Sequence, residues 1–237
     1  DGSVAFRCVA GVCVDQLHRI TVRLGGPHPA GRLQCSDPGA EVVSHQPEAG
    51  GHGTAVLQQR VVADHDGHAG VVTDHHLIET ERPDAVALVN PHTGDDGSAQ
   101  VDYSGAGVAF KLAQALSDAA GYGIPTELLP LAALGTIADI VPLVSENRTL
   151  VREGLRLLGQ TELPGLRALL DISRSPGASG RPTAELISFY VAPRLNAPGR
   201  MGDAGPSLEL LITDDGSEAI ALAERLDSDN TKRRTLS

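Results

Sequence analysis

The sequence has little of several residue types: 237 residues include no tryptophan, one methionine, three phenylalanines and three tyrosines. No apolar run approaches the ~18 residues that a membrane-spanning helix needs, so we expect no membrane partner. The first residues lack a basic leader followed by an apolar stretch, which argues against a secretory signal. The three cysteines have no zinc-site spacing, and we expect them to be reduced thiols in the cytoplasm. Because no initiator methionine is present, we expect a piece of a longer chain.

The chain is acidic, with a net charge of −11 from 30 acidic and 19 basic residues. It therefore repels polyanions at long range, and no basic stripe points to nucleic acid. A nucleic-acid substrate remains compatible with this charge. Divalent metal ions and a few local arginines dominate the field at contact distance.

The first part of the chain differs in amino-acid composition from the rest. All nine histidines and all three cysteines lie in the first 92 residues. Residues 1–60 are rich in glycine, proline and histidine and contain only a weak candidate strand, Arg19–Arg23. We therefore interpret residues 1–68 as an atypical or degenerate N-terminal segment.

From Ala69 onward the apolar pattern becomes regular. Two β-branched runs that end at polar residues predict buried parallel strands at 70–73 and 85–89. Helical spacing of apolar residues predicts helices at 104–120, 127–139, 145–158 with Ser145 as its cap, 183–191, 206–212 and 217–234. The expected fold class is α/β. A parallel sheet flanked by helices occupies residues 69–160, and a mainly helical extension, with the start of a long connecting helix, occupies residues 161–237.

Three polar residues, Asp74, His75 and His76, directly follow the first predicted strand. Ligands of open α/β sheets bind beyond the carboxyl ends of the strands. One carboxylate and two imidazoles can there supply a metal ligand, an orienting group and a phosphate contact. The alternative is a polar turn that happens to contain histidines.

Asp139 lies in an otherwise apolar segment, residues 135–143, whose only other polar side chain is Thr136. A carboxylate in such surroundings costs several kcal/mol unless another group compensates its charge. A bound cation would provide that compensation. The alternative is a carboxylate that faces solvent at the end of a helix, just before Pro142.

Residues 192–201 contain two prolines and a glycine, and they predict a loop between helices that carries Arg194, Asn196 and Arg200. Guanidinium groups match phosphate oxygens bidentately, so this loop is a candidate phosphate contact. The alternative is a pair of solvated arginines.

Two further patterns are weak. Gly105 and Gly107 begin a helix, but the third glycine and the acidic residue of a dinucleotide site are missing, so no organic cofactor is expected. Asp64 and Asp66 could be stray ligands, but their context is typical of a loop.

Several segments in one order resemble the RecJ exonucleases of the DHH phosphoesterase superfamily, which act on single-stranded DNA. The matching segments are residues 71–77, 89–91, 105–112, 134–143, 146–148, 150–155 and 192–201. The likeness covers about residues 69–235. It implies a metal-dependent phosphodiesterase that works in the 5′→3′ direction in DNA repair and recombination, with single-stranded DNA as partner.

The resemblance also implies roles for individual residues at a two-metal site that takes Mn²⁺ or Mg²⁺. His75 and Asp139 would be metal ligands, Asp74 would fix the geometry of His75, and His76 would hydrogen-bond the scissile phosphate. The residues that would grip substrate phosphates are Arg194, Asn196 and Arg200. Mixed imidazole and carboxylate ligands suit Mn²⁺.

The family pattern includes carboxylates that residues 1–68 do not show, namely an Asp-rich motif after the first strand and an aspartate on the strand preceding the DHH strand. Its DHHA1 domain would lie beyond Ser237. We therefore expect both metals to be under-coordinated. A frame-shifted or misassembled translation would explain residues 1–68, and resequencing of the locus tests this hypothesis.

Three functions remain open on the sequence. The first is the single-stranded-DNA exonuclease. The second is a DHH-type phosphatase for short oligonucleotides or nucleoside bisphosphates. The third is a catalytically dead fragment. The segment from Pro193 to Arg200 favours the first, and the missing acidic motifs favour the third.

Overall fold

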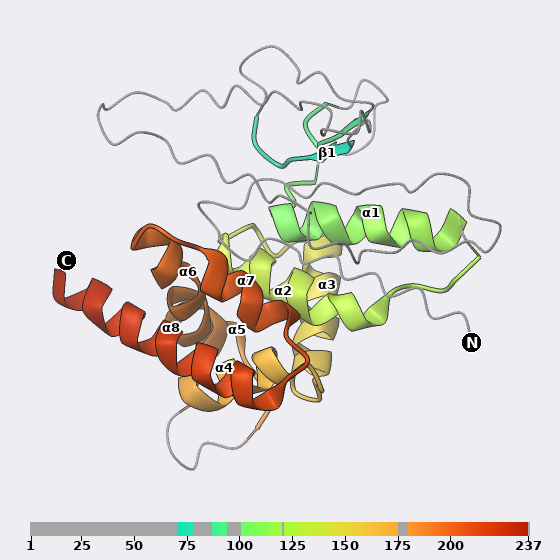
Figure 1. Ribbon diagram of the computed structural model, residues 1–237. Helices are drawn as coiled ribbons and strands as arrows, with labels where there is room; N and C mark the ends of the chain where they lie inside the picture. Colours follow the sequence, from blue (N-terminus) through green and yellow to red (C-terminus); the bar gives the residue numbers. More distant parts are fainter. Residues whose placement is uncertain (1–70, 78–86, 94–100, 120, 175–179, 237) are drawn as a thin grey trace, which may run out of the picture.

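The computed structural model describes residues 71–77, 87–93, 101–119, 121–174 and 180–236. The atypical segment 1–68, its candidate strand Arg19–Arg23 and the Asp64–Asp66 pair lie outside these residues. Figure 1 shows the strands at one end of the molecule, next to helix α1, with the remaining helices on the other side of α1. In the described part of the chain, no helix is both long and apolar enough to cross a membrane.

The two strands are short and parallel, as the sequence predicts. β1 (Val71–Thr73) pairs with β2 (Ala87–Val89), with Val72 opposite Leu88. The amide of Asp74 donates to the carbonyl oxygen of Val89 at 3.0 Å and extends the pairing by one bond. The carboxyl ends of both strands therefore meet at one edge of the pair. Within the described residues the sheet has these two strands.

Helices α1 (Gly105–Ala119), α2 (Leu129–Ala138) and α3 (Ser145–Leu158) follow, with the short 3₁₀-helix η1 (Thr126–Leu128) before α2. Glycines let these helices approach closely. A methyl group on Gly135 would lie 2.4 Å from the Cβ atom of Ala106. One on Gly154 would lie 2.4 Å from the Cβ atom of Ala133. Helices α1 and α2, and likewise α2 and α3, therefore pack so closely that no side chain fits at Gly135 or Gly154.

The helical extension packs around the long helix α8 (Gly216–Leu236), which Figure 1 shows running diagonally across this half of the molecule. The other elements are α4 (Pro164–Ser173), α5 (Ala184–Leu186), the π-helix η2 (Ile187–Val191), α6 (Ala192–Arg200) and α7 (Gly205–Ile212). Helices α4, α6 and α7 all contact α8. The mainly helical extension is as expected, but the sequence reasoning did not identify α4.

The structure corrects two expectations about local structure. Residues 192–201 are not a loop, because α6 spans Ala192–Arg200. Pro193 lies in its first turn, directly after η2, and the helix buries Leu195 and Ala197. Ser145 begins α3 as expected, but its side chain makes no capping bond, and the capping position belongs to Val144.

Helix α2 ends with a left-handed residue, Ile140, at a φ of 56°. The amide of Ile140 donates to the carbonyl of Ile137, and the amide of Val141 donates to that of Thr136. This is the Schellman pattern, in which glycine is the usual left-handed residue. A β-branched residue is strained there, and the Ile140 side chain is 87 % exposed, so burial does not offset the strain.

We therefore expect Ile140→Gly to stabilise the fold. The gain should be about 1 kcal/mol, because a left-handed L-residue costs about 1–2 kcal/mol relative to glycine. Urea denaturation followed by circular dichroism measures it. The control Ile220→Gly lies on an exposed face of α8 and should have the opposite sign, since glycine weakens a helix interior. A loss of stability in Ile140→Gly would contradict this account of the turn.

Candidate metal and phosphate site

His75 and Asp139 come together at the carboxyl edge of the strand pair. His75 follows β1 by two residues, and Asp139 caps the C-terminus of α2. The Nδ1 atom of His75 lies 3.5 Å from the Oδ2 atom of Asp139, although 64 residues separate them in the chain. Both side chains are largely enclosed, with exposures of 16 % and 21 %. The two residues proposed as metal ligands therefore share one place in the fold.

The surroundings of Asp139 favour a nearby cation. Its carboxylate lies at the negative end of the α2 dipole, which destabilises an anion there. The alternative of a carboxylate that simply faces solvent does not fit an enclosed side chain. An imidazole nitrogen and a carboxylate oxygen with bonds of about 2.1 Å to one cation would lie about 3.0–3.4 Å apart. The observed separation of 3.5 Å lies just above this range.

Among the described residues, His75 and Asp139 are the two candidate metal ligands that lie together. Among residues 71–77, 87–93, 101–119, 121–174 and 180–236, no three histidine, cysteine or acidic side chains converge on a metal position. The residues present fit two positions of a mixed imidazole and carboxylate site for Mn²⁺ or Mg²⁺.

Asp74 organises the loop that carries the two histidines. Its Oδ1 atom accepts hydrogen bonds from the amides of His75 at 2.7 Å and His76 at 3.3 Å, and it lies 2.8 Å from Nδ1 of His76. Asp74 thus holds His75 through its main chain, whereas its ring partner is His76.

This pairing shifts the pKa values of both side chains. The hydrogen bond that the His76 ring makes to Asp74 raises the pKa of His76 above 6.5 although burial works against it, and the charges of Asp74 and Asp139 raise the pKa as well. Burial alone would raise the pKa of Asp74, but the hydrogen bonds from the His76 ring and the two amides hold it below 3.8. His76 is therefore more readily a cation, and a hydrogen-bond donor to anions, than an isolated histidine.

These directions predict a pH-dependent stability. The contribution of Asp74 is present above its unfolded pKa and is lost as pH falls through the lower folded value. The contribution of His76 is complete below its unfolded pKa and is lost as pH rises through the higher folded value. In EDTA, His76→Gln should therefore cost more unfolding free energy at about pH 5.5 than at about pH 8.5.

Urea denaturation of the wild type and His76→Gln at both pH values measures this difference. In an Asp74→Asn background, the pH dependence of the His76→Gln effect should become much smaller, because the Asp139 charge still raises the pKa of His76. The same cost at both pH values in the wild-type background would show that the pair does not couple protonation to folding.

The N-terminus of α1 completes one side of the site. A methyl group on Gly105 would lie 3.4 Å from Cδ2 of His75, so the helix begins against the imidazole ring. The Oγ atom of Ser104 accepts from the amide of Gly107 at 3.0 Å and lies 3.1 Å from Oγ1 of Thr136. Thr136 in turn donates to the carbonyl of Ala132. Sequence reasoning missed this buried link, which joins the start of α1 to the last turn of α2.

The three residues expected to grip phosphates all lie on α6, but they have different surroundings. The Nε and Nη2 atoms of Arg194 each lie 2.8 Å from Oδ1 of Asp227 on α8, and Nη1 donates to the carbonyl of Tyr190 at 2.7 Å. Asn196 and Arg200 are four residues apart and so share a face of α6, and Arg200 is exposed. Arg194 therefore fastens α6 to α8.

A family model described as "DHH family, N-terminal domain" matches residues 51–136. The match includes Asp74, His75 and His76, and it ends three residues before Asp139. It begins at residue 51, inside the segment that the sequence analysis treats as atypical. The boundary at Ala69 stays a prediction, because residues 1–70 lie outside the described ranges.

The curated relatives include RecJ proteins described as single-stranded-DNA-specific exonucleases. The chain is 41 % identical over 184 residues to RecJ of Bacillus subtilis, an alignment that covers 78 % of this chain and 23 % of the relative. It is 42 % identical over 166 residues to RecJ of Thermus thermophilus, covering 70 % of this chain and 24 % of the relative. The chain thus spans about a quarter of the length of these relatives.

Solved structures of RecJ also resemble the chain in fold. The structure of RecJ from Thermus thermophilus in complex with Mn²⁺ gives a TM-score of 0.63 at 42 % identity, over 70 % of this chain and 24 % of that chain. A manganese-bound exonuclease RecJ gives 0.64 at 41 % identity, over 70 % and 41 % of the two chains. The Thermus thermophilus complex with Mg²⁺ gives 0.59 at 41 % identity, over 70 % of this chain and 24 % of that chain. Residues 51–136 therefore match the N-terminal domain of the DHH family, and over 70–78 % of its own length the chain resembles the RecJ exonucleases.

Proposed function

We propose that this chain carries part of the active site of a metal-dependent exonuclease that digests single-stranded DNA in the 5′→3′ direction, in repair and recombination. The observation that carries the proposal is the 3.5 Å approach of His75 to Asp139 at the strand edge. An imidazole nitrogen and an enclosed carboxylate at this distance form a place for a divalent cation. The similarity to proteins named single-stranded-DNA-specific exonucleases supports the choice of substrate.

The contacts of each site residue indicate its proposed role. His75 and Asp139 would hold the cation, for which the solved relatives with Mn²⁺ and Mg²⁺ are precedents. Two such ions would supply polarisation of the phosphoryl group and neutralise its developing charge. Asp74 bonds Nδ1 of His76 and favours its protonated form. His76 would then donate from Nε2 to a phosphate oxygen.

Further phosphate contacts would come from α6. Asn196 and Arg200 share a face of that helix, and an exposed guanidinium suits a phosphate of the DNA strand. Arg194 would contribute to the same grip only by exchanging its bonds to Asp227 and Tyr190. We propose Asn196 and Arg200, on one face of α6, as phosphate contacts, and Arg194 as the residue that holds α6 against α8.

We also infer that β1 and β2 belong to a larger parallel sheet flanked by helices, as in the DHH phosphoesterase fold. The parallel pairing and the packing of α1 against β1 support this inference. A DNA substrate further supports a cytoplasmic location for the protein.

The test is hydrolysis by the purified chain. A 5′-labelled single strand should release labelled mononucleotide when Mn²⁺ is added, and EDTA should abolish the release. A 3′-labelled strand should release its label last, and duplex DNA should resist. Absence of any Mn²⁺-dependent release would overturn the proposal for this chain and favour the catalytically dead fragment.

The same assay separates the exonuclease from a phosphatase of short oligonucleotides. An exonuclease should prefer a long strand, because contacts on α6 would bind phosphates beyond the scissile one. Faster hydrolysis of dinucleotides or nucleoside bisphosphates than of long strands would assign the chain to the phosphatases.

A further inference from the structure

A buried asparagine, Asn90, joins the two strand ends beyond the last main-chain bond between them. Asn90 directly follows β2 and is 6 % exposed. Its Nδ2 atom donates to the carbonyl oxygen of His76 at 2.9 Å. Its Oδ1 atom accepts from the amide of His92 at 2.8 Å. One carboxamide thus contacts the histidine loop on one side and its own turn on the other.

The turn that carries Asn90 is itself fixed. The main-chain carbonyl of Asn90 accepts from the amide of Thr93 at 3.1 Å and from the Thr93 hydroxyl at 2.7 Å. Pairing between the strands stops at the bond from Asp74 to Val89. Beyond that bond, the side chain of Asn90 continues the connection between the two strand ends.

The carbonyl that Asn90 holds belongs to the residue after His75. Asp74 holds the amide of His76 and Asn90 holds its carbonyl, so together the two bonds restrict φ and ψ of His76 and limit the backbone freedom of the neighbouring His75. Asp74 holds the amide side of the same loop. Asp74 therefore holds the amides of His75 and His76, and Asn90 holds the carbonyl of His76.

We propose that Asn90 is a positioning residue that holds the His75 ring against the start of α1 and in reach of Asp139. The proposal rests on the proposed function in one respect only, namely that the His75 ring binds a cation from this position. A buried amide is costly unless its hydrogen bonds are made. Asn90 makes bonds from both ends of its carboxamide, one of them to the loop that carries the proposed ligand.

Asn90→Asp isolates the bond that matters. Aspartate has the shape of asparagine and keeps an oxygen for the amide of His92, but it replaces the donor to the His76 carbonyl with a second acceptor. The matched control is Asn230→Asp. Asn230 is also 6 % exposed, but it lies on α8, and its Oδ1 atom accepts from Arg233, a bond that aspartate retains.

The readout is the nuclear Overhauser effect between the Hδ2 proton of His75 and the Hα protons of Gly105, measured without metal or DNA. These groups are adjacent in the structure. We expect the signal in the wild type and in Asn230→Asp, and its loss in Asn90→Asp with the core methyl signals of Leu169 and Leu195 unchanged. A signal of wild-type intensity in Asn90→Asp, or a loss of core methyl signals with it, would overturn the positioning role.

A second measurement needs no variant. In the wild type, the Nδ2 protons of Asn90 should exchange with water much more slowly than the Nε2 protons of the exposed Gln160. Exchange at the same rate for both would overturn the proposal. Because neither measurement involves catalysis, a chain that passes both but hydrolyses nothing refutes the proposed function and leaves the role of Asn90 intact.

Discussion

Asp139→Asn should lower Mn²⁺-dependent hydrolysis of single-stranded DNA by at least about 100-fold. Loss of a group that merely orients a metal ligand costs about 10–100-fold, and Asp139 is itself a proposed ligand. The neutral amide retains the shape of the side chain but removes the negative charge that attracts the cation. Initial rates at saturating and limiting Mn²⁺ measure the effect, and the loss should be larger at limiting Mn²⁺.

The stability of the same variant should change little. Without metal, the negative end of α2 disfavours the Asp139 carboxylate, and the His75 ring 3.5 Å away offsets part of that effect, so the replacement removes opposing contributions. The unfolding midpoint in EDTA should fall by no more than about 3 °C, which corresponds to about 1 kcal/mol at this size.

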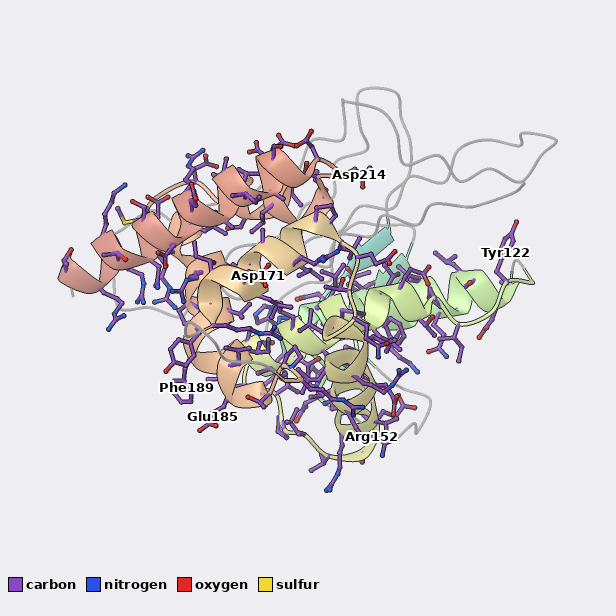
Figure 2. The ribbon with its side chains drawn as sticks, turned by 90° about the horizontal axis from the view of Figure 1, so that it is seen from below. Tyr122, Arg152, Asp171, Glu185, Phe189 and Asp214 are labelled. Atoms are coloured by element: carbon purple, nitrogen blue, oxygen red, sulfur yellow. The ribbon has the colours of Figure 1, made fainter. Side chains whose placement is uncertain are left out.

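The control is Asp171→Asn, an exposed carboxylate on α4 that Figure 2 labels. It should leave both hydrolysis and stability unchanged. If Asp139→Asn hydrolyses DNA as fast as Asp171→Asn does, then Asp139 holds no catalytic cation.

Gly165→Ala should be the most destabilising of the glycine substitutions. A methyl group on Gly165 would lie 1.6 Å from the carbonyl oxygen of Leu210 and 2.7 Å from its carbonyl carbon. Because the obstructing atoms belong to the backbone of α7, α4 and α7 must separate to admit the methyl group. We expect a loss of about 3 kcal/mol, at the upper end of the usual cost of overpacking.

Thermal unfolding followed by circular dichroism should show a midpoint lowered by about 6–12 °C for a chain of this size. Gly216→Ala provides the comparison, because no atom lies within 4 Å of the methyl group that it adds at the start of α8. The unfolding midpoint of Gly216→Ala should equal or exceed that of the wild type, because alanine lowers the conformational entropy of the unfolded chain. Equal midpoints for the two variants would mean that the α4–α7 contact yields easily.

The sequence carried a separate physical signal for His75 and for Asp139, and the resemblance to the RecJ exonucleases predicted that the two share one site. His75 follows a β-branched run, which predicts the ligand-binding edge of a sheet. Asp139 stands in an apolar segment, which predicts a compensated charge. The helices at 104–120 and 145–158 were also predictable, since their apolar residues follow one period, and the structure confirms α1 and α3 within one residue or two.

The helix α6 was not predictable in this way. Prolines and a glycine in residues 192–201 indicate a loop, but burial of Leu195 and Ala197 against the neighbouring helices outweighs the local preference. The role of Arg194 depends on a contact with Asp227, which lies 33 residues further along the chain. No local pattern contains such a contact. The helix predicted at 183–191 corresponds to α5 and η2, of which Figure 2 labels Glu185 and Phe189, but its π-helical turn has no local sequence signal.

The link between Ser104 and Thr136 has a consequence for how the site can change shape. This buried contact, together with the close approach of Gly135 to Ala106, makes α1 and α2 one rigid unit that carries both Gly105 and Asp139. His75 lies instead in the loop after β1, which in the described part of the chain pairs with β2 over three residues. If the separation between His75 and Asp139 changes when a cation binds, the loop after β1 should therefore move while α1 and α2 keep their positions.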